Sequence, residues 1–599
     1  QDGNLFFDGG TMTGVFNQAA SAVLDITAAD SDVTLNAFTL NTLGNVSFTS
    51  AGNDWLFNSS SQWTNSGIAD FLNTGGGADV VNDTTAFLSV INGSSGIMNM
   101  NPTTNIDFFT PFDNQGQVNV FSGKVFETSN PATSNGGIDI AAGGLYRLGT
   151  GTGSSLTLSG TPIFTGTGTM QVETGSIFNV DVPVTLASGL TLEMAGGSIS
   201  NAQNLGLPDI FNINGGTING IGFWDTPFAT GSSINIGGAN PVTINGVEWY
   251  IDRDLNWAGS PATNGIILNS NAKLITAENF TITNNAATGD VISGDGTGVF
   301  EIWNDAFVLV SGSGGFQTNI SVPTKVFGGI LLDNPAATLS ITDTGGLNLQ
   351  NGGLLMGLGT YNGNVNVSSG GIIAPGLPSI LGANIGQLNI VGDVTFEQSS
   401  MLMADMGWTG LAADNLNVTG NVVLNNPELL TAWDSVNSLA ATVLAPYSLV
   451  NASGTLTGDF LVVHDAIGIP ALTSIATPLV SSYTYNPVSG AIDKFWDGGA
   501  ADTQWNSPLN WNLDALPTVG QIVVVETPIV DLNTTATPNL AALQFDLDAI
   551  NVAVNLNVSG ELVNLIGSDI DLNGGTISEL ITNTGTLHNF GAIFVNQNT

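Results

Sequence analysis

The sequence predicts an all-β protein: a parallel β-solenoid (β-helix) rod with a short helical insertion. Three observations predict this fold. Doubled glycines recur along the chain, short pairs of apolar residues alternate with polar ones, and turn-forming residues separate those pairs. The chain has 599 residues, of which 77 are glycine and none is cysteine. Disulfides therefore cannot hold the fold together.

The doubled glycines give the period of the repeat. One pair of neighbouring doublets starts at Gly196 and Gly215, and another pair starts at Gly352 and Gly370, with nearly the same spacing. An apolar residue follows each doublet in GGTM (9–12), GGLY (143–146), GGSI (196–199), GGTI (215–218), GGLL (352–355), GGII (370–373) and GGTI (574–577). A coil that stacks on itself returns with a regular period of this kind, here about 18–20 residues.

The apolar pairs indicate short, half-buried strands. Leu339 with Ile341 and Leu347 with Leu349 are examples, and alternation with period two places both members on one face of a strand. A β-sandwich also uses short strands, but it needs neither an internal period nor this density of glycine. We expect apolar residues inside the coils and Asn, Thr and Ser outside. Coils stacked about 4.8 Å apart give a rod on the order of 120–140 Å long.

One segment breaks the strand pattern. In PELLTAWDSVNSLAATVL (427–444), apolar residues recur at alternating steps of four and three, beginning with Leu429 and Trp433. Asn426 is a suitable capping residue, and Pro427 suits the first helical position. The segment is therefore predicted to be a helix.

A second break divides the chain further. Three tryptophans crowd into FWDGGAADTQWNSPLNWNLDALP (495–517), which we interpret as the start of a second module. The predicted parts are an N-terminal β-solenoid part (1–130), a central β-solenoid (131–426), the helical insertion with connecting strands (427–494) and a C-terminal Trp-containing β-solenoid module (495–599).

The stretch from about 352 to 460 carries a resemblance. It reads GGLLMGLGTYNGNVNVSSGGIIAPGLPS, then GQLNIVGDVTFEQSSMLM, DNLNVTGNVVLNN and SLVNASGTLTGDF. This order resembles that of bacterial surface proteins with autotransporter-associated β-strand repeats. The tryptophan-rich segment at 495–517 is similar to an element that opens a new solenoid in secreted bacterial repeat proteins.

The resemblance implies a right-handed β-solenoid that is secreted from a bacterium or held at its surface, with adhesion or surface assembly as its role. It brings no catalytic residues, because such repeats share no active site. An autotransporter ends in an outer-membrane barrel, whereas this chain ends in TGTLHNFGAIFVNQNT, still in solenoid style. We therefore expect a passenger-like protein without that barrel.

The charge excludes several partners. Only 6 Lys and Arg residues stand against 48 Asp and Glu residues, giving a formal net charge of −42. Binding to a nucleic-acid backbone or to an anionic membrane surface requires a basic patch, which so few cations cannot supply. No run of about 20 apolar residues appears, so membrane insertion is not expected.

Enzymatic activity is not expected either, although β-helices also carry polysaccharide lyases and hydrolases. A polygalacturonase-like site needs clustered aspartates and a histidine between glycines, but His464 and His588 have no such setting. Lyases need a Lys or Arg base, and the six cations are scattered along the chain.

The densest polar cluster is YIDRDLNW (250–257), with Asp252, Arg253 and Asp254. It has two readings. In one, Arg253 binds the carboxylate of a sugar, and the aromatic residues Trp249, Tyr250 and Trp257 stack on sugar rings. In the other, which we favour, the two aspartates neutralise Arg253 at a corner of the coil and aromatic residues cover it.

Calcium is the one cofactor that the sequence suggests. TGGGADVVND (74–83) offers Asp79 and Asp83, and GDVISGDG (289–296) offers Asp290 and Asp295. Both stretches lack the full repeat of calcium-binding β-rolls, so ordinary turn chemistry is the favoured explanation.

The two ends of the chain carry similar motifs, LFFDGGTMTG and DLNGGTIS, which suggests a self-interaction. Unpaired strand edges recruit further strands, so we expect copies to join head to tail into a surface or matrix filament. The predicted interface residues are Leu5, Phe6, Phe7, Trp496, Trp505, Trp511, Phe590 and Phe594. The alternative is a monomeric adhesin that binds surfaces or glycans, and a polysaccharide lyase or hydrolase ranks third.

Overall fold

A computed structural model describes most of the chain. The described residues are 4–27, 31–49, 53–58, 60–72, 78–82, 90–103, 105–149, 153–226, 231–259, 265–284, 289–304, 306–311, 316–341, 346–377, 385–407, 413–434, 447–465, 477–479, 482–485, 494–496, 500, 502–511, 514–519, 521–526, 529–532, 537–538, 540, 542–546, 549–553, 556–558, 562–564, 569–573, 581–583, 587–589 and 592–596. Within these ranges the regular structure is β-strand, apart from short 3-10 turns such as η1 (Ala202–Asn204) and η3 (Pro508–Asn510). The prediction of an all-β fold is confirmed.

The chain divides into two compact units, which are described separately. Unit 1 comprises Gln1–Val308 with Thr318–Pro323, and unit 2 comprises Leu309–Gln317 with Thr324–Thr599.

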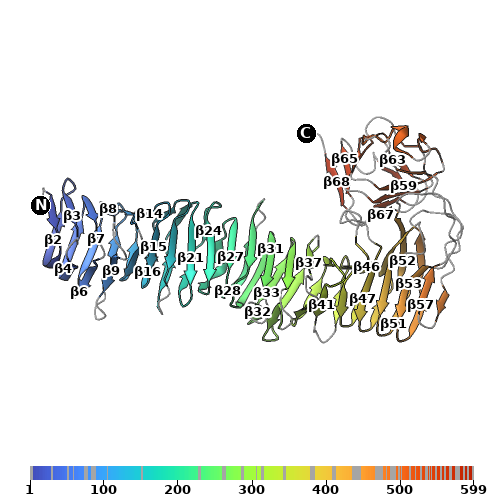
Figure 1. Cartoon of the computed structure of the whole chain (residues 1–599), viewed down its shortest axis with the longest axis horizontal. Coiled ribbons are helices and arrows are strands. Elements are labelled where there is room, and N and C mark those ends of the chain that lie inside the picture. Colours follow the sequence, from blue (N-terminus) through green and yellow to red (C-terminus); the bar gives the residue numbers. More distant parts are fainter. Residues whose placement is uncertain are drawn as a thin grey trace. The chain divides into compact units, whose positions relative to one another are not determined.

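Unit 1 is a parallel β-solenoid in which each coil pairs with the next. A representative coil holds the strands β13 (Phe112–Asn114), β14 (Gln117–Val120) and β15 (Val125–Thr128). They pair in parallel with β16 (Pro131–Ser134), β17 (Gly137–Ile140) and β18 (Leu145–Leu148) of the following coil, so that Phe112, for example, aligns with Ala132. The strands lie side by side along the unit (Figure 1).

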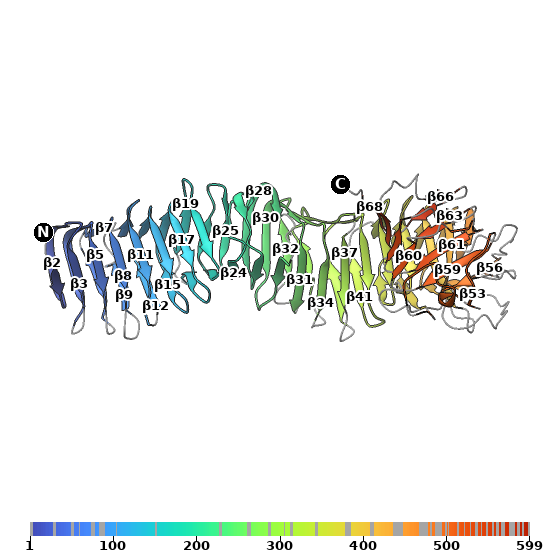
Figure 2. The same cartoon turned by 90° about the horizontal axis from the view of Figure 1, so that it is seen from above.

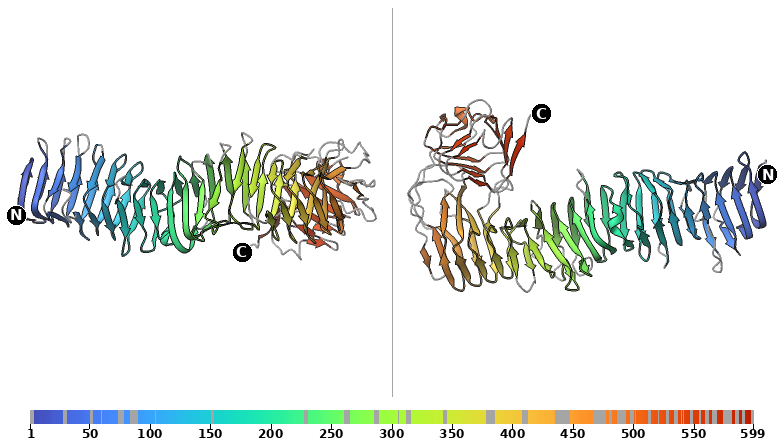
Figure 3. Two further views of the ribbon diagram at one scale, coloured as in Figure 1. Left: turned by 90° about the horizontal axis from the view of Figure 1, so that it is seen from below. Right: turned by 180° about the vertical axis from the view of Figure 1, so that it is seen from behind.

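One sheet of unit 1 shows this stacking without interruption. Its eight strands follow the order β1 (Leu5–Phe7), β3 (Val23–Ile26), β5 (Asn45–Phe48), β8 (Ile68–Phe71), β11 (Ile97–Met100), β14, β17 and β20 (Ile163–Gly166). In Figure 2, β3, β5, β8 and β11 follow one another in this order. The two further views show the same succession of blue to green strands (Figure 3).

The glycine doublets have the predicted role. In unit 1, β25 (Ser198–Ser200) pairs with β28 (Gly216–Thr226), and Ser198 aligns with Thr217. In unit 2, β43 (Leu354–Gly357) pairs with β46 (Ile372–Pro375), and Leu354 aligns with Ile372. In both cases the residue directly after one doublet aligns with the residue directly after the next, so the doublets mark successive coils.

Coil length nevertheless varies along unit 2. Between β51 (Val422–Asn425) and β54 (Leu456–Asp459), Val422 aligns with Leu456. This step along the sequence is much longer than the step from Leu354 to Ile372. Turns of different length therefore connect strands that remain in register.

The C-terminal part of unit 2 forms three parallel sheets of its own. Their orders are β58 (Lys494–Phe495), β59 (Ile522–Glu526), β61 (Ala542–Asp546), β64 (Leu562–Asn564) and β67 (Leu587–Asn589); then β60 (Ile529–Leu532), β62 (Ala549–Val552), β65 (Asp569–Asn573) and β68 (Ala592–Asn596); and finally β63 (Leu556–Val558) with β66 (Ile581–Asn583). These orange to red strands group together in Figure 1.

Alternating side chains fill the interior of the coils. In β14 and β17, Val118, Val120, Ile138 and Ile140 are at most 1% exposed, while the residues between them are partly exposed. Burying such a side chain stabilises the fold by about 1.5–3 kcal/mol, which each coil supplies several times.

The interior also contains amides, which the sequence analysis placed outside. Asn65, Asn92 and Asn114 lie on successive coils and are 0% exposed. The Nδ2 of Asn65 donates to Oδ1 of Asn92 (3.0 Å), and the Nδ2 of Asn92 donates to Oδ1 of Asn114 (2.8 Å). Asn114 in turn donates to Oγ of Ser134 (3.2 Å). We call this row of four residues the buried amide ladder.

The predicted helix at 427–444 is wrong where the structure describes it. Glu428–Asp434 is a strand, β52, that pairs in parallel with β49 (Met401–Gly407), and residues 435–446 lie outside the described residues. Asn426 has φ 56°, a left-handed turn conformation, rather than the extended conformation of a helix cap. Leu429 and Leu430 are both 0% exposed, so burial between neighbouring coils overrides the helical spacing.

Candidate functional site

The first coil has an open edge. β1 pairs with β3, and β2 (Gly10–Gln18) pairs with β4 (Val33–Thr42), but within the described ranges neither β1 nor β2 has a strand on its other side. An edge of this kind can pair with a further strand, whether that strand comes from the same chain or from another copy.

The predicted interface residues of β1 lie on this edge. Leu5 and Phe7 point inward but are only half-buried, whereas Leu24, which aligns with Leu5 on the next coil, is 1% exposed. Phe6 points outward and is 68% exposed, as is Val15 on β2. The first coil thus exposes apolar side chains that a further coil would cover.

The three predicted interface tryptophans are part of a core instead. Trp496, Trp505 and Trp511 are 6%, 4% and 0% exposed and belong to the hydrophobic core of the C-terminal sheets. Trp511 packs edge-on against both neighbours, with ring centroids 4.6 Å from Trp505 and 5.1 Å from Trp496. Its Nε1 donates to the carbonyl of Trp505 (2.8 Å). These rings present almost no surface to a partner.

The tryptophan segment covers the beginning of the C-terminal sheets. Gln504 forms a parallel bridge with Asp531 of β60, and the backbone N–H of Trp505 donates to the carbonyl of Asp531 (3.0 Å). This pairing occupies the edge of β60, the first strand of its sheet. Of the remaining predicted residues, Phe594 lies in β68, the last strand of that sheet, and Phe590 lies outside the described residues.

The calcium candidates Asp290 and Asp295 each accept hydrogen bonds from the protein. Asp290 accepts a hydrogen bond from Oγ of Ser321 (2.6 Å). Asp295 accepts three, from the backbone N–H of Ser270 and Thr297 (both 2.9 Å) and from the hydroxyl of Thr297 (2.6 Å). These bonds hold the pKa of the Asp295 carboxyl below its usual range, the Ser270 N–H contributing most.

The other two calcium candidates, Asp79 and Asp83, give no further evidence of a metal site. Asp79 lies in β9 (Ala78–Asn82), aligned with Asp107, and Asp83 lies outside the described residues. Among the described residues, no group of three or more His, Asp or Glu side chains is placed to hold a metal ion.

The favoured reading of the Arg253 cluster agrees with the structure in the burial of Arg253 and in the role of Asp252, whereas Asp254 is exposed. Arg253 is 3% exposed, and its Nη1 donates to the carbonyl of Pro208 (2.8 Å). Burial lowers the pKa of its guanidinium, while the carboxylates of Asp209 and Asp252 oppose this shift. Asp209 is thus a neutralising neighbour that the sequence analysis did not identify.

The sugar-subsite reading is wrong for three of its members. Trp249 and Trp257 are 0% and 1% exposed, so neither can stack on a ligand, and Arg253 is equally inaccessible. Tyr250 remains, because its side chain points outward from β30 (Val242–Ile251).

Tyr250, which is half-buried, belongs instead to a cluster of outward-facing rings that sequence reasoning missed. Phe223 of β28 is 54% exposed, and its ring centroid lies 5.8 Å from that of Tyr250. Trp303, which follows β36 (Val299–Ile302), is 42% exposed, and its centroid lies 5.2 Å from Tyr250. We call Phe223, Tyr250 and Trp303 the aromatic surface.

Acidic groups surround the aromatic surface. Burial raises the pKa of the Tyr250 phenol, and the carboxylates of Asp252, Asp225 and Glu278 raise it further. Nε1 of Trp303 donates to a carboxylate oxygen of Glu301 (3.3 Å). The surface therefore combines aromatic faces with a negative electrostatic potential.

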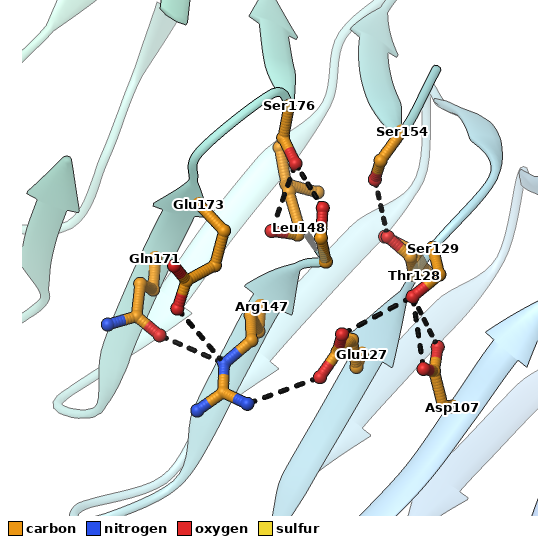
Figure 4. A network of polar contacts seen from close by, with 11 residues as sticks. Asp107, Glu127, Thr128, Ser129, Arg147, Leu148, Ser154, Gln171, Glu173 and Ser176 are labelled. Carbon is orange, nitrogen blue, oxygen red and sulfur yellow. Dashed lines mark hydrogen bonds and ion pairs between the residues drawn. The ribbon is translucent and has the colours of Figure 1, made fainter. Parts of the chain in front are cut away.

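A second polar cluster lies on the outside of unit 1 (Figure 4). Arg147 is paired with Glu127 (3.2 Å) and Glu173 (3.6 Å), and its Nε donates to Oε1 of Gln171 (2.9 Å). Burial raises the pKa of Glu173; the carboxylates of Glu127 and Glu193 add to this, and Arg147 opposes it. This guanidinium is already paired with protein carboxylates, as expected of a structural ion-pair network.

Comparisons with known proteins add little. No protein-family model matches the sequence, and no curated protein matches it. One matching solved structure is described as the crystal structure of a TibC-catalysed, hyper-glycosylated TibA fragment, 55–350. The match covers 68% of this chain and 98% of that chain, with 13% sequence identity and a TM-score of 0.21. Within the described ranges, no helix is both long and apolar enough to cross a membrane. The strand pairings of the chain itself establish that it is a parallel β-solenoid.

Proposed function

We propose that this protein is an extracellular structural protein of a bacterial surface or matrix, and that its copies extend a filament by joining head to tail. The observation that carries the proposal is the open edge of the first coil, formed by β1 and β2. An edge strand with exposed backbone groups and apolar side chains is a template for another strand. The bacterial surface location rests on the resemblance of residues 352–460 to surface repeat proteins.

The energetics favour occupation of that edge. Leu5, Phe7 and Phe16 point toward the interior but are half-buried. Covering what remains exposed of each is worth about 0.5–1 kcal/mol, roughly a third of a full transfer from water. Backbone pairing along both strands adds to this. A contact between different ends of two copies leaves new ends free, so it produces an open filament rather than a closed dimer.

Salt decides whether such a contact forms. With a net charge of −42 per chain, copies repel one another at low ionic strength. Salt shortens the range of that repulsion to about 8 Å at physiological ionic strength, so only charges close to the contact still oppose it. The proposed role requires no catalytic residue and no cofactor.

Electron microscopy of edge variants tests the proposal. Phe6→Lys combined with Val15→Lys places two charges on the open edge, and both side chains are already 68% exposed, so folding is preserved. We expect filaments from the wild-type protein at physiological salt and single particles from the double variant. Ile221→Lys, at a residue that is 75% exposed but far along the coil stack, is the matched control and should still form filaments.

Two other outcomes contradict the proposal. Single particles of the wild-type protein under all salt conditions would favour the monomeric adhesin, and filaments that persist in the double variant would exclude this edge. An activity screen on acidic polysaccharides detects the third class, a lyase or hydrolase.

A further inference from the structure

We propose that the aromatic surface binds an amino-sugar polysaccharide, whose sugar rings stack on Phe223, Tyr250 and Trp303 and whose ammonium groups pair with the surrounding carboxylates. This site is separate from the first coil, so it does not depend on the assembly proposed above.

The position of the rings suits a linear polymer. Asp225 of β28 aligns with Tyr250, so Phe223 lies one coil before Tyr250. Ile251 aligns with Thr276 and Thr276 with Ile302, so Trp303 lies two coils after it. Three coil steps of about 4.8 Å each separate the outer two backbone positions by about 14 Å along the coil stack. The ring centroids of neighbouring members are 5.8 and 5.2 Å apart, so one oligosaccharide can contact all three rings.

The rings are available to a ligand. The Tyr250 and Trp303 rings meet at an interplanar angle of 71° and the Phe223 and Tyr250 rings at 34°, so no two rings cover each other face to face. Exposed aromatic groups clustered in this way mark a binding surface more often than isolated ones do.

The charge around the rings selects the class of ligand. Asp225, Asp252 and Glu278 act on Tyr250, and Glu301 accepts the indole N–H of Trp303. Lys273 is close by, but its ammonium is paired with Glu248 (3.3 Å). Such a surface repels sugars that carry carboxylates or sulfates. It attracts ammonium groups, which also bind favourably to aromatic faces.

Binding of two matched oligosaccharides tests this inference. The probe is a hexamer of β-1,4-linked glucosamine, and its N-acetylated counterpart is the uncharged control. Isothermal titration calorimetry in mildly acidic buffer at physiological salt keeps the amines protonated and the carboxylates ionised. We expect the glucosamine hexamer to bind with a defined stoichiometry and the N-acetylated hexamer to bind at least about fivefold more weakly.

Variants locate the binding. Trp303→Ala and Phe223→Ala should each weaken binding of the glucosamine hexamer about fivefold or more. Phe121→Ala is the matched control, because Phe121 is 42% exposed, like Trp303, but lies elsewhere on unit 1. It should bind like the wild type. Thermal unfolding of all variants checks that none has lost its fold.

Three results would overturn the inference. The first is absence of binding to the glucosamine hexamer. The second is equal weakening by Trp303→Ala and Phe121→Ala, which indicates diffuse attraction to a chain of charge −42. The third is a lysine hexamer that binds with the same dependence on Trp303, which identifies a basic protein segment as the partner.

Discussion

Replacing Asn92 with alanine should destabilise the coils around it far more than the size of the change suggests. Asn92 is 0% exposed. Its Nδ2 donates to Oδ1 of Asn114 (2.8 Å) and to the carbonyl of Gln117 (3.0 Å), and its Oδ1 accepts from Asn65 (3.0 Å). The substitution removes all three hydrogen bonds.

The expected loss of stability depends on whether each hydrogen-bond partner of Asn92 keeps another partner. Nδ2 of Asn65 keeps two acceptors, the carbonyls of Gly67 and Ile97 (both 3.2 Å). Oδ1 of Asn114 loses its donor inside the coils, and a buried acceptor left without a partner costs about 1–3 kcal/mol. The small cavity adds about 1 kcal/mol, so the expected loss of stability is about 3 kcal/mol.

Hydrogen exchange measures this loss locally, which matters because stacked coils need not unfold in one step. A loss of about 3 kcal/mol corresponds to roughly 150-fold faster exchange of the amides in residues 90–120. Asn119→Ala is the matched control: its Nδ2 donates to Oδ1 of Asn99 (2.8 Å), but it lies on the outer face. It should cost less than about 0.5 kcal/mol. Equal exchange rates in the two variants would refute the reasoning.

Two further substitutions probe a turn and a charge. Gly166 has φ 102°, and a Cβ there would overlap the backbone carbonyl of Ile140, so Gly166→Ala should cost about 2–4 kcal/mol. Gly123 also has a positive φ, 69°, but open space around it, so Gly123→Ala should cost only about 1 kcal/mol; equal shifts in thermal unfolding would show that the steric overlap is unimportant. Burial raises the pKa of Glu173 in the folded state above its unfolded value, so the folded state disfavours the ionised form. The protein therefore loses stability as the pH rises from the unfolded pKa through the folded pKa. Glu173→Gln should therefore stabilise the protein at neutral pH, by about 0.5 kcal/mol at this partly exposed position. The gain in stability should vanish below the unfolded pKa of 4.5, and urea unfolding at several pH values would detect this. A loss of stability of Glu173→Gln at neutral pH would show instead that the ion pair with Arg147 dominates.

The repeat could be predicted because its turns carry a local signal. Positive φ values are easiest for glycine, so the doublets at Gly196 and Gly352 mark turns wherever they occur. The strand alternation is equally local, and Leu339 and Leu347 are 0% exposed, as their pattern predicts. These signals are sufficient to identify a solenoid.

Contacts between coils could not be predicted in the same way. The aromatic surface joins rings from three coils, and coil length varies, so Phe223, Tyr250 and Trp303 have no recognisable spacing in the sequence. Nothing in the sequence distinguishes Asn92 from a surface asparagine, because only the strand register places it between Asn65 and Asn114. The helix predicted at 427–444 was wrong for the same reason, since only the coils next to β52 show why Leu429 and Leu430 are both buried.

The buried amide ladder has a consequence for acid tolerance. Asparagine and serine side chains have no proton to gain or lose over the range in which carboxylates titrate. The polar bonds from Asn65 to Ser134 therefore persist as the pH falls, whereas the pair between Arg147 and Glu173, whose pKa burial raises, is lost when Glu173 becomes neutral. Acidification also removes most of the charge behind the mutual repulsion of copies. An acidic environment thus leaves the interior of the coils intact while it makes the outer surfaces more prone to associate.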